Sequence, residues 1–314
     1  MALRLKELSE QRDLLSGGHR ACAGCGCTVV IRQMLLAAGP DTVVGCATGC
    51  MEVATSIYPY TAWRVPWIHN AFENAAATIS GVEAAYRVLK KKGKIKKRIN
   101  FIALGGDGGT YDIGLQALSG AAERGHRMLY VCYDNEAYMN TGVQRSSATP
   151  LGAATSTSPA GAAIPGKQGF RKDLTEIMIA HHIPYVAQAS AHNWRDFMTK
   201  VKKALAIDGP TFINVLGTCH RGWRFKMEDS IEMARLAVET CYWPLYEVEN
   251  GKWTLNYQPR RKLPLDEWTR GQGRFAHLYK EENQQILDQA QQVVDRQWKK
   301  LLIRCGQREK NGCC

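Results

Sequence analysis

The sequence lacks any long apolar run that could cross a membrane. Its least charged region, residues 43–63, is interrupted by Gly45, Gly49, Glu52 and Pro59, so it does not supply the roughly 20 continuous apolar residues of a spanning helix. Residues 1–15 alternate charges with leucine and have neither the apolar stretch nor the cleavage site of a secretory signal. These absences predict a cytoplasmic protein with no membrane partner.

Acidic residues are also scarce relative to basic ones. Lys and Arg number 41 against 29 Asp and Glu, which gives a formal net charge of +12. Such a charge suits nucleic acid, an anionic cofactor or an acidic protein partner. The basic residues form only short runs, and no zinc-finger or RNA-recognition signature accompanies them. The sequence therefore predicts no nucleic-acid partner, and composition leaves the other two classes open.

Short β-branched runs alternate with longer amphipathic segments, which is the pattern of a doubly wound α/β fold with a mostly parallel sheet. Buried strands are predicted at residues 42–45, 99–104, 128–133 and 211–216. Helices are predicted at residues 28–38, 72–89, 112–124, 174–180 and 194–206. Ligands of such folds bind at the carboxyl ends of the strands.

Two segments depart from this alternation. Residues 148–169 are almost entirely Ala, Gly, Ser, Thr and Pro, too poor in large apolar side chains for a core element, and they predict a functional loop. After residue 225 the pattern changes to a helix at 230–241, an irregular stretch and a charged helix near 281–302. We interpret residues 1–225 as the main domain and residues 226–314 as a C-terminal extension that packs on partner subunits.

Glycines and an aspartate follow the strand predicted at 99–104. In residues 105–109, Gly-Gly-Asp-Gly-Gly, the glycines allow backbone amides to approach phosphate oxygens at the start of a helix. Asp107 would repel phosphate unless a cation lay between them, so it is interpreted as a ligand of Mg2+. The end of the next strand supplies Asn135 as a second oxygen donor. This pairing is the fingerprint of a thiamine-diphosphate site.

Other phosphate-binding motifs do not fit. A nicotinamide-type Gly-x-Gly-x-x-Gly would need glycine at position 111, which is Tyr111, and no Gly-Lys-Ser/Thr follows a strand. In the remaining alternative, the glycines form a tight turn and Asp107 caps the next helix. The presence of Asn135 at the neighbouring strand end favours the cofactor site.

The eleven cysteines predict metal binding or redox chemistry, because disulfides are rare in the cytoplasm. Cys22 and Cys25 form a Cys-x-x-Cys motif, and Cys50 and Cys219 each follow a strand end near the diphosphate loop. Four thiolates suit either zinc or an iron–sulfur cluster. The lack of a compact ferredoxin-like run keeps structural zinc open, whereas a neighbouring carbanion-forming cofactor favours a cluster. Core packing is expected for Cys132, and no function is assigned to Cys241, Cys305, Cys313 and Cys314.

Taken together, these motifs resemble the β subunit of pyruvate:ferredoxin oxidoreductases and their relatives. The matching segments are Cys-Ala-Gly-Cys-Gly at 22–26, Ala-Thr-Gly-Cys at 47–50, Gly-Asp-Gly at 106–108, Asp-Ile-Gly at 112–114, Asp-Asn-Glu-Ala-Tyr-Met-Asn-Thr-Gly at 134–142 and Cys-x-x-Gly-Trp at 219–223. The resemblance implies thiamine-dependent oxidative decarboxylation of pyruvate to acetyl-CoA and CO2, or of oxalate to CO2. Electrons would pass through a 4Fe–4S cluster to ferredoxin.

The resemblance also implies roles for individual residues. The 4Fe–4S ligands would be Cys22, Cys25, Cys50 and Cys219. The Mg2+ ligands would be Asp107, Asn135 and the carbonyl oxygen of Ala137. The cofactor-binding residues would be Thr48, Gly49, Cys50, Gly106, Asp107, Gly108, Asn135 and Asn140, of which Asn140 faces the reacting centre as the catalytic residue. Cys27 and Cys46 fall outside the ligand pattern and are expected to pack.

In this family another subunit supplies the glutamate that activates the thiamine ring, and a further subunit carries ferredoxin-type clusters. The resemblance therefore implies a hetero-oligomer, with ferredoxin as electron acceptor and coenzyme A as co-substrate if the substrate is pyruvate. His220 and Arg221 stand where relatives usually carry proline. They would raise the cluster potential or suit a more anionic substrate such as oxalate, or they are a surface substitution without consequence. His69 and Asn70 are further candidates near the cofactor, or caps at a helix start. The alternatives are a non-redox thiamine enzyme with structural zinc and a metal-stabilised assembly subunit.

Overall fold

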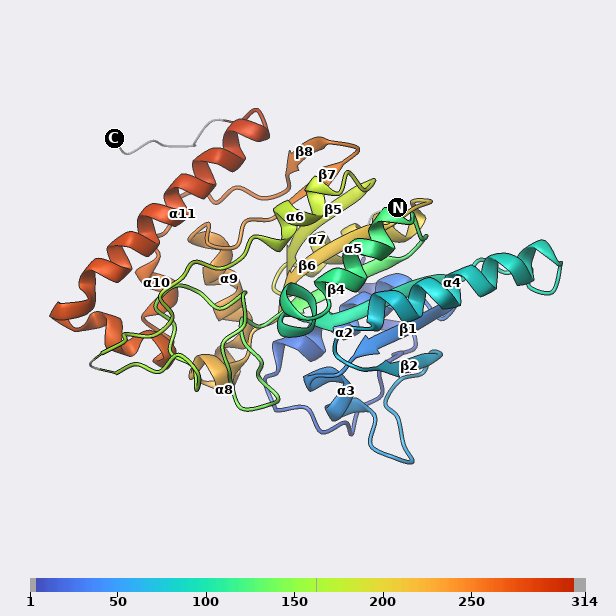
Figure 1. The fold of residues 1–314 in the computed structure, drawn as a ribbon, viewed down its shortest axis with the longest axis horizontal. Coiled ribbons are helices and arrows are strands. Elements are labelled where there is room, and N and C mark those ends of the chain that lie inside the picture. Colours follow the sequence, from blue (N-terminus) through green and yellow to red (C-terminus); the bar gives the residue numbers. More distant parts are fainter. Residues whose placement is uncertain (1–3, 162, 308–314) are drawn as a thin grey trace.

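The computed structural model describes residues 4–161 and 163–307 (Figure 1), so Cys313 and Cys314 lie outside the described residues. Eight strands form one sheet in the order β2-β1-β3-β4-β6-β5-β7-β8. The first six strands in this order are parallel, and β7 and β8 continue the sheet in antiparallel pairing. The bounds are β1 Thr42–Ala47, β2 Trp67–Asn70, β3 Asn100–Gly106, β4 Leu129–Asp134, β5 Tyr185–Ser190, β6 Thr211–Leu216, β7 Tyr246–Glu249 and β8 Lys252–Leu255.

Helices cover both faces of the sheet, which confirms the predicted doubly wound α/β fold. One face packs against α2 (Gly26–Ala38) and α7 (Trp194–Ala206), and the other against α4 (Ala75–Lys91), α5 (Leu115–Glu123) and α6 (Leu174–Ala180). Successive residues of a strand point to opposite faces, and both faces are apolar here, which explains the nearly continuous apolar runs. None of the described helices is long and apolar enough to cross a bilayer.

Shorter helices lie around this framework. They are α1 (Leu5–Ser9), α3 (Cys50–Thr55), α8 (His220–Trp223), α9 (Ser230–Glu239), α10 (Asp266–Thr269), three 3-10 segments (Met227–Asp229, Gly273–Tyr279 and Glu281–Asn283) and a π-helical turn (Gly108–Asp112). The long helix α11 (Gln284–Arg304) lies at one end of the molecule, and α4 projects at the opposite end (Figure 1).

The four predicted strands are present, with boundaries shifted by up to two residues, but two parallel strands were not predicted. For His69 and Asn70, the alternative that they cap a helix start was wrong, because both lie in β2. The helix expected from residue 112 begins at Leu115, after the π-helical turn. The missed strand β5 is fully buried, yet its Ala-Gln-Ala-Ser end has none of the β-branched residues that mark strands in a sequence.

The C-terminal segment shares the core of the preceding residues. Strand β7 pairs with β5, placing Val248 opposite Val186. One apolar cluster joins Leu216 of β6 and Trp223 of α8 to Trp268 and other buried side chains of the C-terminal segment. The segment is therefore built into the same sheet and core. Its packing on partner subunits stays a prediction.

Candidate active site

A cleft lies at the carboxyl ends of β1, β3 and β4, where a parallel sheet is expected to bind its ligand. The loops after these three strands line it, together with Phe72 and Tyr133. All eight predicted cofactor-binding residues belong to this lining: Thr48, Gly49, Cys50, Gly106, Asp107, Gly108, Asn135 and Asn140, accompanied by Ala137. The structure thus brings the predicted residues together from three separate loops.

Asp107 is the buried acid of the cleft. Its Oδ2 accepts a hydrogen bond from Ser146 Oγ at 2.5 Å, and its Oδ1 accepts one from the backbone N–H of Asn135 at 3.3 Å. Burial, and next the charge of Asp134, raises the pKa of Asp107 well above its usual value. A cation at Oδ1 would offset the cost of burying this charge.

The side-chain amide of Asn135 provides the observation that points to such a cation. One end of this amide lies 2.9 Å from Asp107 Oδ1 and 2.8 Å from the carbonyl oxygen of Ala137, and without a metal its nitrogen occupies this end and donates to both oxygens. When the amide turns over, its oxygen joins the other two, and three oxygens so placed are stable together only around a cation. A carboxylate, an amide oxygen and a backbone carbonyl are ligands that suit Mg2+. The donor set therefore fits the predicted metal.

The floor of the cleft fits a phosphate group. The buried Tyr133 hydroxyl makes no hydrogen bond of normal geometry among the described residues. A Cβ at Gly49 would come within 3.0 Å of this hydroxyl, and one at Gly106 within 3.4 Å. At Gly108 a Cβ would collide with the ring of Tyr138. The glycines therefore leave space on the floor of the cleft beside the Tyr133 hydroxyl, which can donate a hydrogen bond to a phosphate oxygen.

Of the four predicted cluster cysteines, Cys50 lines this cleft. Cys25 immediately precedes α2, Cys50 begins α3 and Cys219 immediately precedes α8. Their charges influence one another and are influenced by Cys22, so the four sulfurs belong to one region. Gly24, between the first two, has φ +74°, and a Cβ there would collide with the Met227 carbonyl.

The thiol groups differ in their acidity. Hydrogen bonding with the Cys27 side chain, and next with the N–H groups at the start of α2, lowers the pKa of Cys25 to about 6, although burial opposes this. Burial, reinforced by Cys219, raises the pKa of Cys50 to about 12. Burial also raises the pKa of Cys219 to about 11, although its sulfur accepts a hydrogen bond from Gly222 N at 3.4 Å. Several thiolates this close require a positive centre to be stable together.

No three His, Cys, Asp or Glu side chains within residues 4–161 and 163–307 are grouped so that they could hold a single metal ion. A 4Fe–4S cluster binds each of its four cysteines to a different iron, so its ligands lie farther apart than those of one ion. The assignment of Cys22, Cys25, Cys50 and Cys219 to a cluster stays a prediction. Cys27, Cys46 and Cys132 are fully buried.

Four further residues were candidates in the sequence, namely His69, Asn70, His220 and Arg221, and two of them lie beside the cleft. His69 Nε2 lies 2.9 Å from Thr48 Oγ1, and the carbonyl of Asn70 accepts hydrogen bonds from the same threonine. His220 and Arg221 are in α8 and do not line the cleft. His69 and Asn70 therefore contact the loop after β1, which lines the cleft. His220 and Arg221, on which the oxalate alternative rests, are not part of the lining.

A buried charge network behind the cleft was not predicted. Glu136 is fully buried; its Oε1 accepts from Arg171 Nη1 at 3.0 Å and from the Tyr242 hydroxyl at 2.5 Å, and its Oε2 accepts from Arg274 Nη2 at 2.6 Å. Arg171 also binds Asp134 at 2.7 Å. Asp134 and Glu136 stood in a recognised motif, and a buried acid requires partners, but no local pattern indicates which distant residues provide them.

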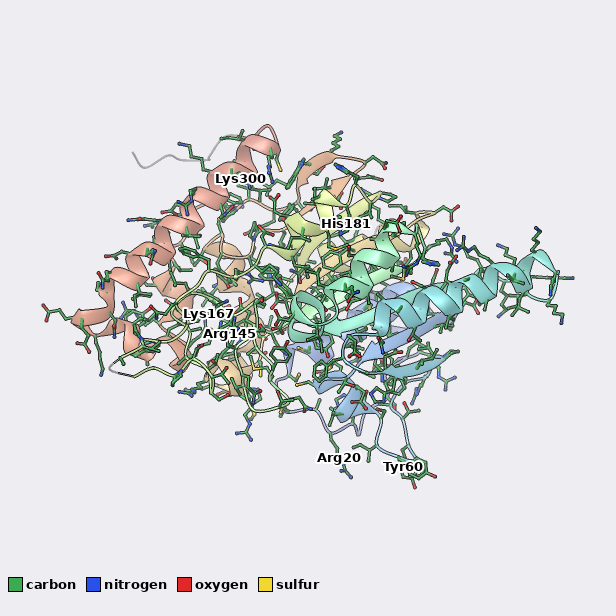
Figure 2. The ribbon with its side chains drawn as sticks, viewed as in Figure 1. Arg20, Tyr60, Arg145, Lys167, His181 and Lys300 are labelled. Atoms are coloured by element: carbon green, nitrogen blue, oxygen red, sulfur yellow. The ribbon has the colours of Figure 1, made fainter. Side chains whose placement is uncertain are left out.

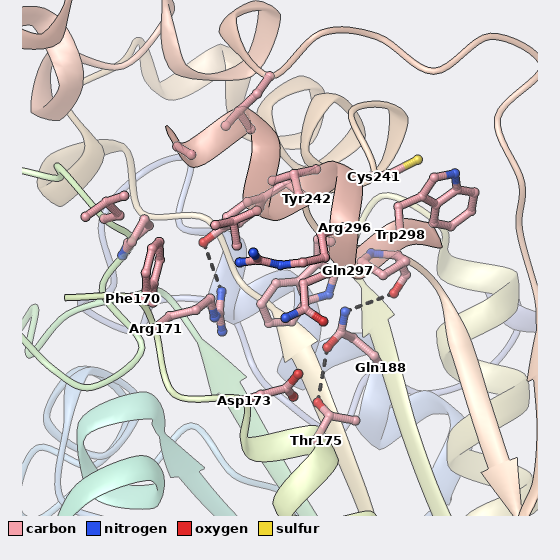
Figure 3. Close-up of a pocket in the computed structure, with 18 of the residues that line it drawn as sticks. Phe170, Arg171, Asp173, Thr175, Gln188, Cys241, Tyr242, Arg296, Gln297 and Trp298 are labelled. Carbon is pink, nitrogen blue, oxygen red and sulfur yellow. Dashed lines mark hydrogen bonds between the residues drawn. The ribbon is translucent and has the colours of Figure 1, made fainter. Parts of the chain in front are cut away.

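A second, larger cavity lies beneath α11 (Figure 3). Its walls include Phe170, Trp298 and other apolar side chains, and it contains none of the predicted cofactor residues. Arg171 and Tyr242 line it, joined by a hydrogen bond of 3.0 Å (Figure 3). Two of the three residues that hold Glu136 therefore form part of its wall.

Comparison with known proteins identifies the family. Residues 43–215 match the family described as thiamine pyrophosphate enzyme, C-terminal TPP binding domain. Pyruvate synthase subunit PorB of Thermotoga maritima is 52% identical over 312 residues, which cover 96% of each chain. PorB of Methanocaldococcus jannaschii is 56% identical over 293 residues, covering 93% of this chain and 97% of that protein. This chain belongs to the β-subunit family of 2-oxoacid:ferredoxin oxidoreductases.

Other members of the family differ in their named substrate. Ketoisovalerate oxidoreductase subunit VorB of Pyrococcus abyssi is 45% identical over 286 residues, covering 90% of this chain and 91% of that protein. A solved 2-oxoglutarate:ferredoxin oxidoreductase from Magnetococcus marinus has a TM-score of 0.56 at 20% identity, covering 72% of this chain and 81% of that chain. That structure shows the same fold. The family and the thiamine-diphosphate-binding domain predicted from the sequence are confirmed.

Proposed function

We propose that this chain holds thiamine diphosphate with Mg2+ and a 4Fe–4S cluster in a pyruvate:ferredoxin oxidoreductase of the cytoplasm. The observation that carries the proposal is the convergence of the Asp107 carboxylate, the Asn135 amide and the Ala137 carbonyl in a glycine-lined cleft. Pyruvate is proposed as the substrate because relatives at 52% and 56% identity are named pyruvate synthase subunits.

The cofactor would be held from its diphosphate end. Asp107, Asn135 and the Ala137 carbonyl would bind Mg2+, and the loops at Gly49, Gly106 and Gly108 would accept the phosphates, with the Tyr133 hydroxyl as an additional donor. When bound, thiamine diphosphate supplies a carbanion and an electron sink for decarboxylation of a 2-oxoacid. The chain itself contributes a fixed metal position.

Asn140 is proposed to contact the reacting groups. It lies in a tight turn, in which Gly142 N donates to the Met139 carbonyl at 3.3 Å and Val143 N donates to the Tyr138 carbonyl at 3.0 Å. Its side chain is exposed on the cleft lining. An amide at this position can both donate and accept a hydrogen bond, so it can orient the carboxylate and the keto group of a 2-oxoacid.

Cys22, Cys25, Cys50 and Cys219 would hold the cluster. A 4Fe–4S cluster supplies a one-electron acceptor beside the cofactor. The N–H groups at the start of α2 and Gly222 N donate toward Cys25 and Cys219, and such hydrogen bonds to sulfur stabilise the reduced form. Cys50 follows directly on Thr48 and Gly49, which joins the two proposed sites through one loop.

Partner subunits would complete the site. The proposed partners are a subunit that provides the activating glutamate, a subunit with ferredoxin-type clusters, and ferredoxin, with coenzyme A as acyl acceptor. The loop after α3 exposes Tyr58 and Tyr60 by 95% and 78%. Figure 2 shows Tyr60 and Arg20 at the same end of the molecule. Tyrosine and arginine are common at the centres of protein interfaces, which supports this end as the contact with a partner.

The cluster assignment can be tested with Cys50→Ala and a matched control, Cys305→Ala, in the anaerobically purified complex. We expect Cys50→Ala to lose iron, sulfide and the broad visible absorption of an iron–thiolate cluster in this chain, and Cys305→Ala to retain them. A wild-type chain with thiamine diphosphate and zinc but no iron would instead support the non-redox enzyme. A chain that binds neither cofactor would support the assembly subunit.

The substrate is tested separately with the intact complex. Ferredoxin reduction is compared for pyruvate with coenzyme A, for 2-oxoisovalerate with coenzyme A, and for oxalate alone. We expect the highest kcat/KM for pyruvate. A higher value for 2-oxoisovalerate would favour the branched-chain alternative, which the 45% identity to VorB keeps open. Faster turnover of oxalate without coenzyme A would overturn the assignment.

A further inference from the structure

We propose that Arg274 is a positioning residue for the metal: acting through Glu136, it holds the Asn135–Ala137 turn in the conformation that presents its oxygens to Asp107. Arg274 lies 138 residues from Glu136 in the chain, and their side chains meet at 2.6 Å. The inference rests on the proposed Mg2+ site. It makes the C-terminal segment part of that site.

The turn has a backbone conformation that needs support. Glu136 stands between Asn135, whose amide lies 2.9 Å from Asp107 Oδ1, and Ala137, whose carbonyl oxygen lies 2.8 Å from the same amide, and its φ is +69°. A residue with a side chain adopts this left-handed conformation only where its surroundings enforce it. Here the side chain is fully buried and bonded at both carboxylate oxygens. The anchored carboxylate therefore fixes the orientation of the peptide groups on either side of it.

Arg274 bonds one oxygen of the Glu136 carboxylate, and two other residues bond the second oxygen. The oxygen bonded by Arg274 is Oε2, whereas Oε1 has both Arg171 and Tyr242. Two carboxylates, Asp134 and Glu136, face two guanidinium groups, so the buried charges balance. Removing Arg274 would leave a carboxylate oxygen unpaired and one buried negative charge uncompensated, which is more disruptive than removing the pair together.

Arg274 also supports the turn by a second route. Its guanidinium lies 4.1 Å from the centre of the Trp223 ring, and Trp223 Nε1 donates to the backbone carbonyl of Asn135 at 2.8 Å. One arginine thus supports the side chain of Glu136 and the tryptophan that fixes the preceding carbonyl. Arg274 is only 2% exposed, so bulk water does not reach Glu136 Oε2 to take the place of the guanidinium group.

The sign of the effect separates positioning from simple electrostatics. Arg274 is a positive charge near a cation site, so a purely electrostatic role predicts tighter Mg2+ binding when it is removed. A positioning role predicts weaker binding, because the oxygens lose their orientation. Loss of a residue that orients metal ligands typically weakens metal affinity by about 10–100-fold.

The experiment measures the Mg2+ concentration that gives half-maximal binding of thiamine diphosphate to the purified complex, followed by quenching of tryptophan fluorescence. We expect Arg274→Met to raise this concentration about tenfold or more, with the same maximum at saturating Mg2+. Arg270→Met is the control, since Arg270 is exposed and pairs with Asp266; its half-saturation should match the wild type. Arg274→Lys, which keeps the charge, should recover part of the loss.

Several results would overturn the inference. A positioning role is excluded if the half-saturating Mg2+ concentration of Arg274→Met equals that of Arg270→Met or lies below it. If Arg274→Met does not assemble, Tyr242→Phe removes a single donor to Glu136 and should raise half-saturation by a smaller factor; no rise would count against the inference. A wild-type complex that binds thiamine diphosphate without Mg2+, or not at all, would instead overturn the proposed function and this inference with it.

Discussion

Replacing Asp107 by asparagine should make the metal-free chain more stable while abolishing its response to Mg2+. Asp107 is 1% exposed, and burial, with the charge of Asp134, raises its pKa well above the usual value. A carboxyl group whose pKa is raised by folding stabilises the folded state most below its unfolded pKa, and this contribution is lost as the pH increases through the folded pKa. At neutral pH the buried acid therefore weakens the metal-free fold.

The size of the gain follows from the linkage between pKa and stability. Each pKa unit corresponds to about 1.4 kcal/mol, and a change of that size moves the melting temperature of a chain of this length by about 3 °C. The introduced amide would keep the shape of the side chain and could still accept from Ser146 or from Asn135 N, which bond the two carboxylate oxygens at 2.5 and 3.3 Å. The gain should therefore be present at pH 8 and should vanish near pH 4.

The assay is thermal unfolding of wild type and Asp107→Asn with a chelator, and again with Mg2+ and thiamine diphosphate. With the chelator the variant should melt higher. With Mg2+ and cofactor at 100 times their dissociation constant the wild type gains about 2.7 kcal/mol, and its melting temperature should rise relative to that of the variant by the corresponding amount. A variant that melts below the wild type in chelator, or that gains as much from Mg2+, would refute the assignment of Asp107 as a buried metal ligand.

Three other substitutions test the surroundings of the site. Trp223→Phe removes the hydrogen bond to the Asn135 carbonyl, so the free energy of unfolding in urea should fall by about 1–2 kcal/mol; an unchanged value would mean that this bond contributes nothing. Burial lowers the pKa of His192 to about 4, so the unfolded state takes up the proton first and wild-type stability should fall between about pH 6.5 and pH 4. The free energy of unfolding of His192→Gln should fall by about 3 kcal/mol less than that of the wild type across this pH window. Equal pH dependence in the two proteins would contradict the burial of His192. Lys167 is 5% exposed and donates to the carbonyls of Ser147 and Thr149 at 3.3 and 2.5 Å. Lys167→Met should therefore increase the rate of limited proteolysis within residues 148–169, with the cleavage sites mapped by mass spectrometry. An unchanged rate would mean that these hydrogen bonds do not hold the loop.

Local pattern was sufficient for the parts of the fold that are buried on both faces. Strands β1, β3, β4 and β6 are short, mostly apolar runs, so each could be predicted from its own residues. Strand β5 could not, because Gln188 and Ser190 look like loop residues. Its position is decided by contacts far away in the sequence: Gln188 accepts from Thr175 Oγ1 at 3.1 Å and donates to the Pro244 carbonyl at 3.0 Å.

In the candidate site, too, some features could be predicted from local sequence and others depend on distant contacts. Asp107 and Asn135 could be placed together because each follows a strand, and adjacent parallel strands end at the same edge of the sheet. The partners of Glu136 could not be predicted, because they come from three positions, 35, 106 and 138 residues farther along the chain. Each guanidinium or hydroxyl group reaches its carboxylate through the tertiary fold, and nothing in its neighbouring residues indicates the pairing.

The choice of glutamate at position 136 has a physical reason. Glycine occupies most of the positive-φ positions in the described residues, because it adopts this conformation without strain. A glycine at position 136 would remove the strain, but it would also leave the turn free to rotate, since no side chain would tie it to Arg171, Tyr242 and Arg274. Buried ion pairs add little to stability compared with apolar packing, but they can select one arrangement over its alternatives. At a turn that must hold two oxygen atoms beside Asp107, a strained but anchored residue serves binding better than a relaxed and mobile one.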